Sequence, residues 1–359
     1  MRIIQRLHGV PSAAVRIVGI GTVALAAAAI AAQAAPPPAP VPISACGFVI
    51  SSPGSYVAAN DLDATSGNQN CIVIAAPNVR LNLKGFHVFG TQDGTGIGIL
   101  IRKGANRAIV EGADEVQNTD PPNGTEGGPT ITAAPQQSEV AKWKIGIEDD
   151  ANDAKIALFA AIGGITTDNG NTPGNTIGGV LLNKVTGGFV GVLNANYNGQ
   201  YGVMLNNSSN VTLANLSVNY NGETGLKLVK SNGNAFGPGG ALSNGHYGIW
   251  LQSSSSNRIH DSNGNTLNKD TGILLSCSSG VTCRGINASN DNRITNGGAP
   301  ANLKAGIVIT QGNAGNIVTV THNEQNGNPN SDMIDLNPNC GTNTWYNNVG
   351  MGNQPCTQQ

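Results

Sequence analysis

A short apolar motif recurs through the middle of the chain: a glycine followed by three residues, of which the first and the third are aliphatic. It occurs six times, at Gly179, Gly202, Gly225, Gly248, Gly272 and Gly306. Successive glycines are 23, 23, 23, 24 and 34 residues apart. Alternation over so few residues, rich in Val, Ile and Leu and bounded by Asn, Gly and Ser, predicts short strands, because it does not fit the 3.6-residue period of a helix.

Turn residues recur in step with this motif. An asparagine stands four positions before each glycine, at Asn175, Asn198, Asn221, Asn244, Asn268 and Asn302. Three of these asparagines are followed by glycine, and Asn-Gly tolerates positive φ in a tight turn, so a turn is expected before every strand. A second asparagine opens another short apolar run, at Asn210, Asn234, Asn257, Asn292 and Asn316. A period of about 20 to 50 residues with two or more strands per unit predicts a solenoid, whose units bury their apolar faces by stacking.

The longest repeat keeps the usual ending, Asn292-Arg293-Ile294, so its extra residues fall between Gly272 and Asn292. Cys277 and Cys283 lie in that stretch. We therefore expect an excursion from the solenoid that is closed by its own disulfide.

The cadence Gly-Ile-x-Leu, Ser-Ser-Asn-x-Ile, Asn-Gly resembles the repeat of the pectin-lyase-like superfamily, over roughly Cys71 to Leu336. The resemblance implies an all-β protein, a single-stranded right-handed parallel β-helix with coils of about 23 residues. The general handedness of parallel crossovers agrees with this. Because the superfamily includes lyases, glycoside hydrolases, epimerases, metal-delivery factors and adhesins, the resemblance does not imply one reaction.

The chain begins with the features of an export signal. Arg2, Arg6 and Arg16 precede the apolar residues 17–30, and the small-residue site Ala32-Gln33-Ala34 follows, so residues 1–34 are expected to be a secretory signal peptide. A membrane anchor is disfavoured because the apolar run is short for a bilayer span. Periplasmic or extracellular localisation follows, with no membrane span in the mature chain.

The exported part is interpreted as one solenoid with a cap at each end. Residues 35–45 form a proline-rich linker, residues 46–77 resemble an N-terminal cap, and residues 78–336 hold the β-helix. Residues 337–359 resemble a disulfide-stapled C-terminal cap, in which Trp345 would pack on the last coil and cover the open sheet edge.

The repeat lapses at residues 112–174, which are rich in Pro and Gly and contain the acidic run Glu148-Asp149-Asp150. An insertion of this length is either a surface loop or an element that carries function. Within it, Gly146-Ile147 matches a coil strand.

Composition narrows the function classes. Charged residues make up 11% of the chain and the net charge is −2, so no basic footprint for nucleic acid is present. Six cysteines in an exported chain predict three disulfides, and proximity suggests Cys46 with Cys71, Cys277 with Cys283, and Cys340 with Cys356. No Cys/His cluster indicates a metal site, and no motif supports Ca²⁺, so no cofactor is expected. The chain is expected to be monomeric.

Stacking turns sequence register into proximity, because equivalent residues of adjacent coils lie about 4.8 Å apart. One outward column would hold Met204, Lys227, Trp250, Leu274 and Val308, and a second would hold Gln200, Glu223, His246, Asp270 and Lys304. An imidazole between two carboxylates suits a general acid or base, so Glu223, His246 and Asp270 are the candidate catalytic residues. Lys227 and Trp250 are candidates for binding a sugar. The alternative is a solvent-exposed row of charges that merely relieves repulsion.

Arg258 and Arg293 occupy matching positions on adjacent coils. Such a pair can hold uronate carboxylates, or it can bond turn carbonyls. Motifs of the alginate epimerases, polygalacturonases and pectate lyases are missing from the sequence. The sequence therefore predicts an exported β-helix protein that binds or processes polysaccharide along one face and, if it is an enzyme, is a lyase or hydrolase of acidic glycans. The alternative is a non-catalytic scaffold of the cell envelope or of adhesion.

Overall fold

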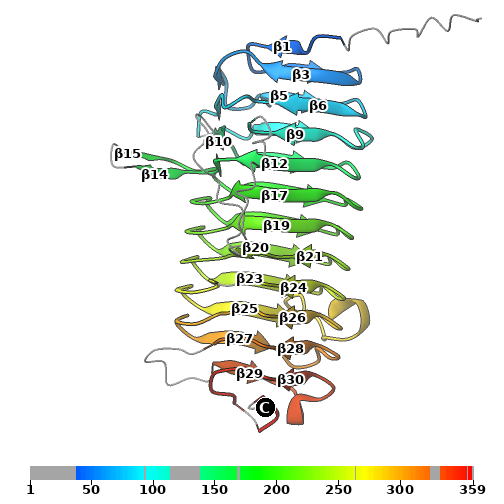
Figure 1. Cartoon of the computed structure of the whole chain (residues 1–359), viewed down its shortest axis with the longest axis vertical. Coiled ribbons are helices and arrows are strands. Elements are labelled where there is room, and N and C mark those ends of the chain that lie inside the picture. The colour runs from blue at the N-terminus through cyan, green and yellow to red at the C-terminus, as the bar shows by residue number, and fades with distance from the viewer. Residues whose placement is uncertain are drawn as a thin grey trace, which may run out of the picture. The chain divides into compact units, whose positions relative to one another are not determined.

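The computed structural model describes residues 38–92, 94–113, 138–167, 170–262, 264–323, 332–353 and 355–357. The expected signal peptide, residues 1–34, lies outside these residues, as do residues 114–137 and 168–169 of the expected insertion. Two long parallel sheets account for most of the described strands, and each turn of the chain adds one strand to both (Figure 1).

Sheet 1 contains the glycine motifs. Its eleven strands are, in spatial order, β2 (Phe48–Ile50), β5 (Ile72–Ile74), β8 (Ile97–Ile101), β11 (Ile145–Asp149), β16 (Gly178–Asn183), β18 (Tyr201–Asn206), β20 (Thr224–Val229), β23 (Tyr247–Gln252), β25 (Thr271–Ser276), β27 (Ala305–Ile309) and β29 (Met333–Asp335). All neighbouring pairs among them are parallel. The glycine-motif strands therefore stack on one another in sequence order, as the predicted solenoid requires.

Sheet 2 contains the runs opened by the second asparagine. Its strands are β1 (Val41–Ile43), β3 (Gly54–Ala58), β6 (Val79–Asn82), β9 (Ile109–Glu111), β12 (Lys155–Phe159), β17 (Phe189–Asn194), β19 (Thr212–Ser217), β21 (Ala235–Phe236), β22 (Gly239–Gly240), β24 (Arg258–His260), β26 (Arg293–Thr295), β28 (Ile317–Thr319) and β30 (Thr344–Tyr346). A small parallel sheet 3 contains β4 (Leu62–Asp63), β7 (Val88–Phe89), β10 (Glu139–Ala141) and β13 (Ala161–Ile162). A hairpin of β14 (Ile165–Thr167) and β15 (Gly170–Thr172) is antiparallel and projects from the stack (Figure 1).

The core lies between the sheets and is filled by the aliphatic positions of the repeat. Val203 and Leu205 are fully buried, whereas Met204 between them is half-buried on the outer face. The motif glycines form a straight file, because a Cβ placed on Gly202 would lie 2.9 Å from the carbonyl oxygen of Gly225 one coil further along. Each coil thus covers the apolar face of the next, as a solenoid requires.

The first asparagine of each repeat forms a buried hydrogen-bonded ladder. Each side-chain Nδ2 donates to the Oδ1 of the next asparagine, at 3.0, 3.1, 3.1, 3.0 and 2.9 Å along Asn175, Asn198, Asn221, Asn244, Asn268 and Asn302. The same Oδ1 atoms accept the backbone N–H of the preceding asparagine, at 3.0 Å from Asn198 to Asn221. Buried amides are stable only when they are paired, so stacking in register satisfies them all at once.

The expected turns are present, but the expectation that Asn-Gly supplies the positive φ was wrong. The left-handed residue precedes the ladder asparagine, at Tyr197, Tyr220, Ser243, Leu267 and Ala301, with φ between 53° and 57°. The glycines are required for close approach instead. A Cβ on Gly199, Gly222 or Gly245 would lie 2.0, 2.0 or 1.8 Å from a backbone oxygen of the adjacent coil.

A second asparagine ladder runs through Asn234, Asn257, Asn292, Asn316 and Asn343, with Nδ2–Oδ1 distances of 3.0, 3.1, 3.1 and 3.1 Å. Asn210 was expected to belong to this set. It is exposed and left-handed, and the backbone N–H of Val211 contacts Asn234 in its place, at 2.9 Å. The ladder therefore begins one coil later than the sequence indicated.

Strand pairing in sheets 1 and 2 extends beyond residues 78–336. Residues 46–77, expected as a cap, contribute β2, β3 and β5, which pair in register with the following coils. At the other end, β30 continues sheet 2, and Trp345 is buried with its Nε1 donating to Asp335 at 3.1 Å. Gly146-Ile147 lies in β11 between β8 and β16, so it is a coil strand, as predicted.

The three predicted disulfides, Cys46–Cys71, Cys277–Cys283 and Cys340–Cys356, are formed. Within the described part of the chain, no helix is long and apolar enough to cross a membrane.

Candidate functional site

The predicted column of charged residues is formed at the start of the sheet 1 strands. The backbone N–H of His246 donates to the carbonyl oxygen of Glu223 at 2.7 Å, and that of Asp270 donates to His246 at 2.9 Å. Gln200 and Lys304 continue the column by the same bonds, at 2.8 and 2.9 Å. Glu223, His246 and Asp270 therefore lie on three consecutive coils, although their proposed catalytic roles remain a prediction.

Within this column, in the part of the chain that the structure describes, Asp270 is held by neighbouring side chains, whereas the ring of His246 is not. Asp270 Oδ2 accepts from Lys304 Nζ at 2.5 Å, and its Oδ1 accepts from the Thr271 hydroxyl at 3.0 Å. The His246 ring is exposed, and among the described residues no hydrogen bond or ion pair joins it to Glu223 or Asp270. The imidazole is therefore available to a ligand, whereas Asp270 is already held by a cation.

Lys227 and Trp250 are paired across β20 and β23 on the outer face of sheet 1. Lys227 Nζ lies 4.4 Å from the centre of the indole ring, close enough for a cation–π interaction. Burial lowers the pKa of Lys227, and the charge of Glu223 opposes that shift. The indole Nε1 donates to the Ser276 hydroxyl at 2.8 Å. The Trp250 ring is thus held in one orientation, with one face covered by the lysine.

Three further residues belong to this face and were missed in the sequence. The Tyr247 ring lies 5.0 Å from that of Trp250. Burial and the charge of Glu148 raise the pKa of Tyr201. Glu148 belongs to the outward column, because it pairs with Leu181 on the next coil and Leu181 pairs with Met204 on the coil after that. Burial, with Asp150 nearby, raises the pKa of Glu148 itself. The signal was available, because Tyr201 and Tyr247 both stand directly before a motif glycine.

We call this surface the sheet 1 face. It consists of Glu148, Tyr201, Glu223, Lys227, His246, Tyr247, Trp250 and Asp270. Aromatic rings, a cation and carboxylates occur together here, which suits recognition of a polar ligand with an apolar side.

Arg258 and Arg293 are adjacent, as predicted, and both are exposed. They lie on sheet 2, however, so they do not belong to the sheet 1 face. Arg293 Nε donates to the Thr295 hydroxyl at 3.1 Å. Among the described residues, no three His, Cys, Asp or Glu side chains are grouped so as to hold a metal ion.

Comparisons with known proteins concern the fold. No family model matches the sequence, and no curated protein matches it. A double mutant of the periplasmic alginate epimerase AlgG superposes with a TM-score of 0.50 at 12% identity, over 78% of this chain and 71% of that one. A single mutant of AlgG gives a TM-score of 0.50 at 13% identity, with the same coverage of both chains. The A-module of the Azotobacter vinelandii mannuronan C-5 epimerase AlgE6 gives a TM-score of 0.46 at 12% sequence identity, over 88% of this chain and 90% of that one. The predicted fold, an all-β right-handed parallel β-helix, is confirmed.

Proposed function

We propose that this protein binds an acidic polysaccharide along the sheet 1 face and that Glu223 and His246 act on it. The observation that carries the proposal is the fixed Lys227–Trp250 pair beside Glu223 and His246 on consecutive coils. Successive coils are about 4.8 Å apart, so one extended glycan would meet the same column several times.

Lys227 would bind the charged group of the sugar, and the aromatic side chains would contact its ring. Lys227 offers a positive charge to a uronate carboxylate, and it keeps its contact with Trp250 while doing so. Tyr247 adds a second ring beside the indole, at 5.0 Å. Rings with one apolar face and one polar edge suit sugars, which present both kinds of surface.

Proton transfer is assigned to the neighbouring column. His246 is exposed, and an exposed imidazole can both accept and donate a proton, which suits a general acid or base. Glu223 and Asp270 are two coils apart, so their backbones are separated by about 9.6 Å, close to the largest carboxylate spacing of inverting glycosidases, about 9.5 Å. Because Lys304 holds Asp270, we assign proton transfer to Glu223 and His246 and a positioning role to Asp270.

Two other features support export of the protein and an acidic polysaccharide as its ligand. Three disulfides favour an oxidising compartment outside the cytoplasm, consistent with export. The AlgG structures of the same fold are named for alginate, an acidic polysaccharide, which adds support for this ligand class.

The test is a panel of acidic and neutral polysaccharides, followed by unsaturated-uronate absorbance, by reducing ends and by binding. We expect turnover of an acidic member, lost in Glu223→Gln and in His246→Gln, with binding weakened about tenfold in Lys227→Gln. Lys269→Gln, an exposed lysine outside the sheet 1 face, is the matched control. Unchanged turnover in the Glu223→Gln/His246→Gln double variant would remove the catalytic assignment.

A second candidate is a non-catalytic scaffold of the cell envelope or of adhesion. The two buried asparagine ladders favour it, because they stiffen the stack whether or not a ligand binds. Binding without any turnover in the same panel would select this alternative.

A further inference from the structure

The coil between Thr271 and Asn292 carries residues that stacking does not need. The preceding coils take 23 or 24 residues and this one takes 34, yet the ladders cross it without a break. Asn257 Nδ2 donates a hydrogen bond to Asn292 Oδ1 at 3.1 Å, and the backbone N–H of Ser254 donates to Ser289 Oγ at 3.0 Å. The excursion, residues 277–288, therefore contributes something other than coil stacking.

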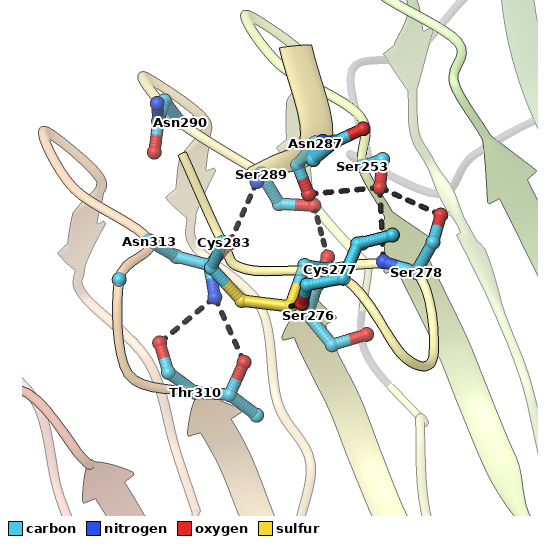
Figure 2. Close-up of a disulfide and its surroundings, with 12 residues drawn as sticks. Ser253, Ser276, Cys277, Ser278, Cys283, Asn287, Ser289, Asn290, Thr310 and Asn313 are labelled. Atoms are coloured by element: carbon cyan, nitrogen blue, oxygen red, sulfur yellow. Dashed lines mark hydrogen bonds between the residues drawn. A yellow bond between two sulfur atoms is a disulfide. The ribbon is translucent and has the colours of Figure 1, made fainter. Parts of the chain in front are cut away.

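The excursion is fixed to the adjacent coil (Figure 2). Besides the Cys277–Cys283 disulfide, Ser253 Oγ donates to the carbonyl oxygen of Asn287 at 2.9 Å and lies 2.9 Å from Ser278 Oγ. Ser255 Oγ donates to the carbonyl oxygen of Ala288 at 3.1 Å. So many anchors hold the excursion in one position against the turns beside it.

Between the excursion and those turns lies a groove of about 520 Å³. This excursion groove is lined by Asn207, Lys230, Asn232, Ser253, Ser255, Ser256, Gly285 and Ile286. Its volume is within the range of small-ligand sites, roughly 300 to 1,000 Å³. Gly285 and Ile286 come from the excursion, and the other lining residues come from three stacked turns between sheets 1 and 2.

The lining combines three kinds of chemistry. Ser253 and Ser255 use their hydroxyls within the protein, so this part of the groove is preformed. Lys230 is exposed, and its ammonium group has no partner among the described residues. Ile286 is 91% exposed at the lip, an unusual place for a large apolar side chain. A free cation, amides and an apolar lip match an anionic sugar better than an apolar ligand.

A second groove of about 470 Å³ lies on the same edge and is lined by two lysines, Lys103 and Lys184, together with Asp150, whose carboxylate accepts from Asn183 Nδ2 at 3.0 Å. Its Lys184 is one coil from Asn207, since Lys184 N–H donates to the carbonyl oxygen of Asn206 at 2.8 Å. A ligand longer than one sugar unit can therefore contact lysines of both grooves, which favours a segment of a polymer.

We propose that the excursion groove is a second glycan-binding site, separate from the sheet 1 face, that takes one anionic sugar unit of an extended polysaccharide. The carboxylate or sulfate group of that unit contacts Lys230 Nζ, its hydroxyls bond the amides of Asn207 and Asn232, and its apolar ring face packs on Ile286. The site does not depend on the function proposed above.

Calorimetry with short oligosaccharides tests this proposal. The ligands are a trigalacturonate, a sulfated tetrasaccharide and the neutral maltotriose. We expect one of the two anionic ligands to bind the parent protein. That ligand should bind Lys230→Gln at least tenfold more weakly and Ile286→Ser severalfold more weakly. Maltotriose should bind the parent no more tightly than it binds Lys230→Gln. Lys269→Gln is the matched lysine control and should bind as the parent does. Carbodiimide coupling of bound trigalacturonate should label Lys230.

Trp250→Ala separates this site from the sheet 1 face. Loss of anionic binding in Trp250→Ala but not in Lys230→Gln would overturn the groove and leave the sheet 1 face standing. Binding kept in Trp250→Ala and lost in Lys230→Gln supports the groove. Absence of binding by either anionic ligand, or equal binding by the parent and Lys230→Gln, would also overturn it. Far-UV circular dichroism checks that each variant is folded.

Discussion

Replacing Asn221 by alanine removes one rung from the middle of the first asparagine ladder. Asn221 is 2% exposed and contacts the coils on both sides. Its Oδ1 accepts from the backbone N–H of Asn198 at 3.0 Å, and its Nδ2 donates to the carbonyl oxygen of Ala195 and to Asn244 Oδ1, both at 3.1 Å. The ladder is buried, so water does not readily replace the lost amide.

The magnitude follows from which groups lose their partner. Asn198 Nδ2 keeps the carbonyl oxygen of Ile162 at 3.1 Å, and Asn244 Oδ1 keeps the backbone N–H of residue 221 at 3.0 Å. The N–H of Asn198 and the carbonyl of Ala195 are left unpaired. Each buried unpaired group costs about 1 to 3 kcal/mol, so Asn221→Ala, which leaves two such groups, should lower the free energy of unfolding by about 2 to 6 kcal/mol.

Urea unfolding followed by circular dichroism measures this loss. Asn194→Ala is the matched control, because Asn194 donates a comparable bond, to the carbonyl oxygen of Ala160 at 2.8 Å, from an exposed position. Water replaces that bond, so the control should lose less than about 1 kcal/mol. A loss in Asn221→Ala no larger than in the control would refute the view that the ladder stabilises the stack.

Other outcomes are expected from single features of the fold. Gly222→Ala should destabilise by about 3 kcal/mol or more and lower Tm, because the new Cβ would lie 2.0 Å from a carbonyl oxygen of the adjacent coil. Removing the Cys46–Cys71 bridge by serine substitution should cost about 3 to 4 kcal/mol in unfolding free energy, measured against the oxidised parent, because the bridge closes a 25-residue separation. Burial raises the pKa of Glu139 and that of Asp149 to about 7 each. Their neutral forms are favoured in the folded state, so stability should be greatest below about pH 4 and fall as pH rises to about 7. The loss should reach about 3 kcal/mol for Glu139 and about 4 kcal/mol for Asp149, and urea midpoints at pH 5 and pH 8 should differ less in Glu139→Gln.

The sequence predicted the site only where register alone decides position. Glu223, His246 and Asp270 stack because each stands two residues before a motif glycine, and the same rule extended by one position would have found Tyr201 and Tyr247. Capture of Asp270 by Lys304 was not predicted, because it depends on the reach of a long side chain across a coil.

The sequence by itself determined the stacked coils, the two rows of asparagines and the three disulfides, because a repeat fixes the register along the stack and nearby cysteines restrict the pairing. Only the tertiary structure decided which face each column occupies. Arg258 and Arg293 lie on sheet 2, away from Trp250, because the bends between strands set the direction of each side chain. It also decided that the left-handed residues are Tyr197, Tyr220, Ser243, Leu267 and Ala301, each directly before a ladder asparagine. The glycines Gly199, Gly222 and Gly245 are required for another reason, because a backbone oxygen of the adjacent coil leaves no room for a Cβ.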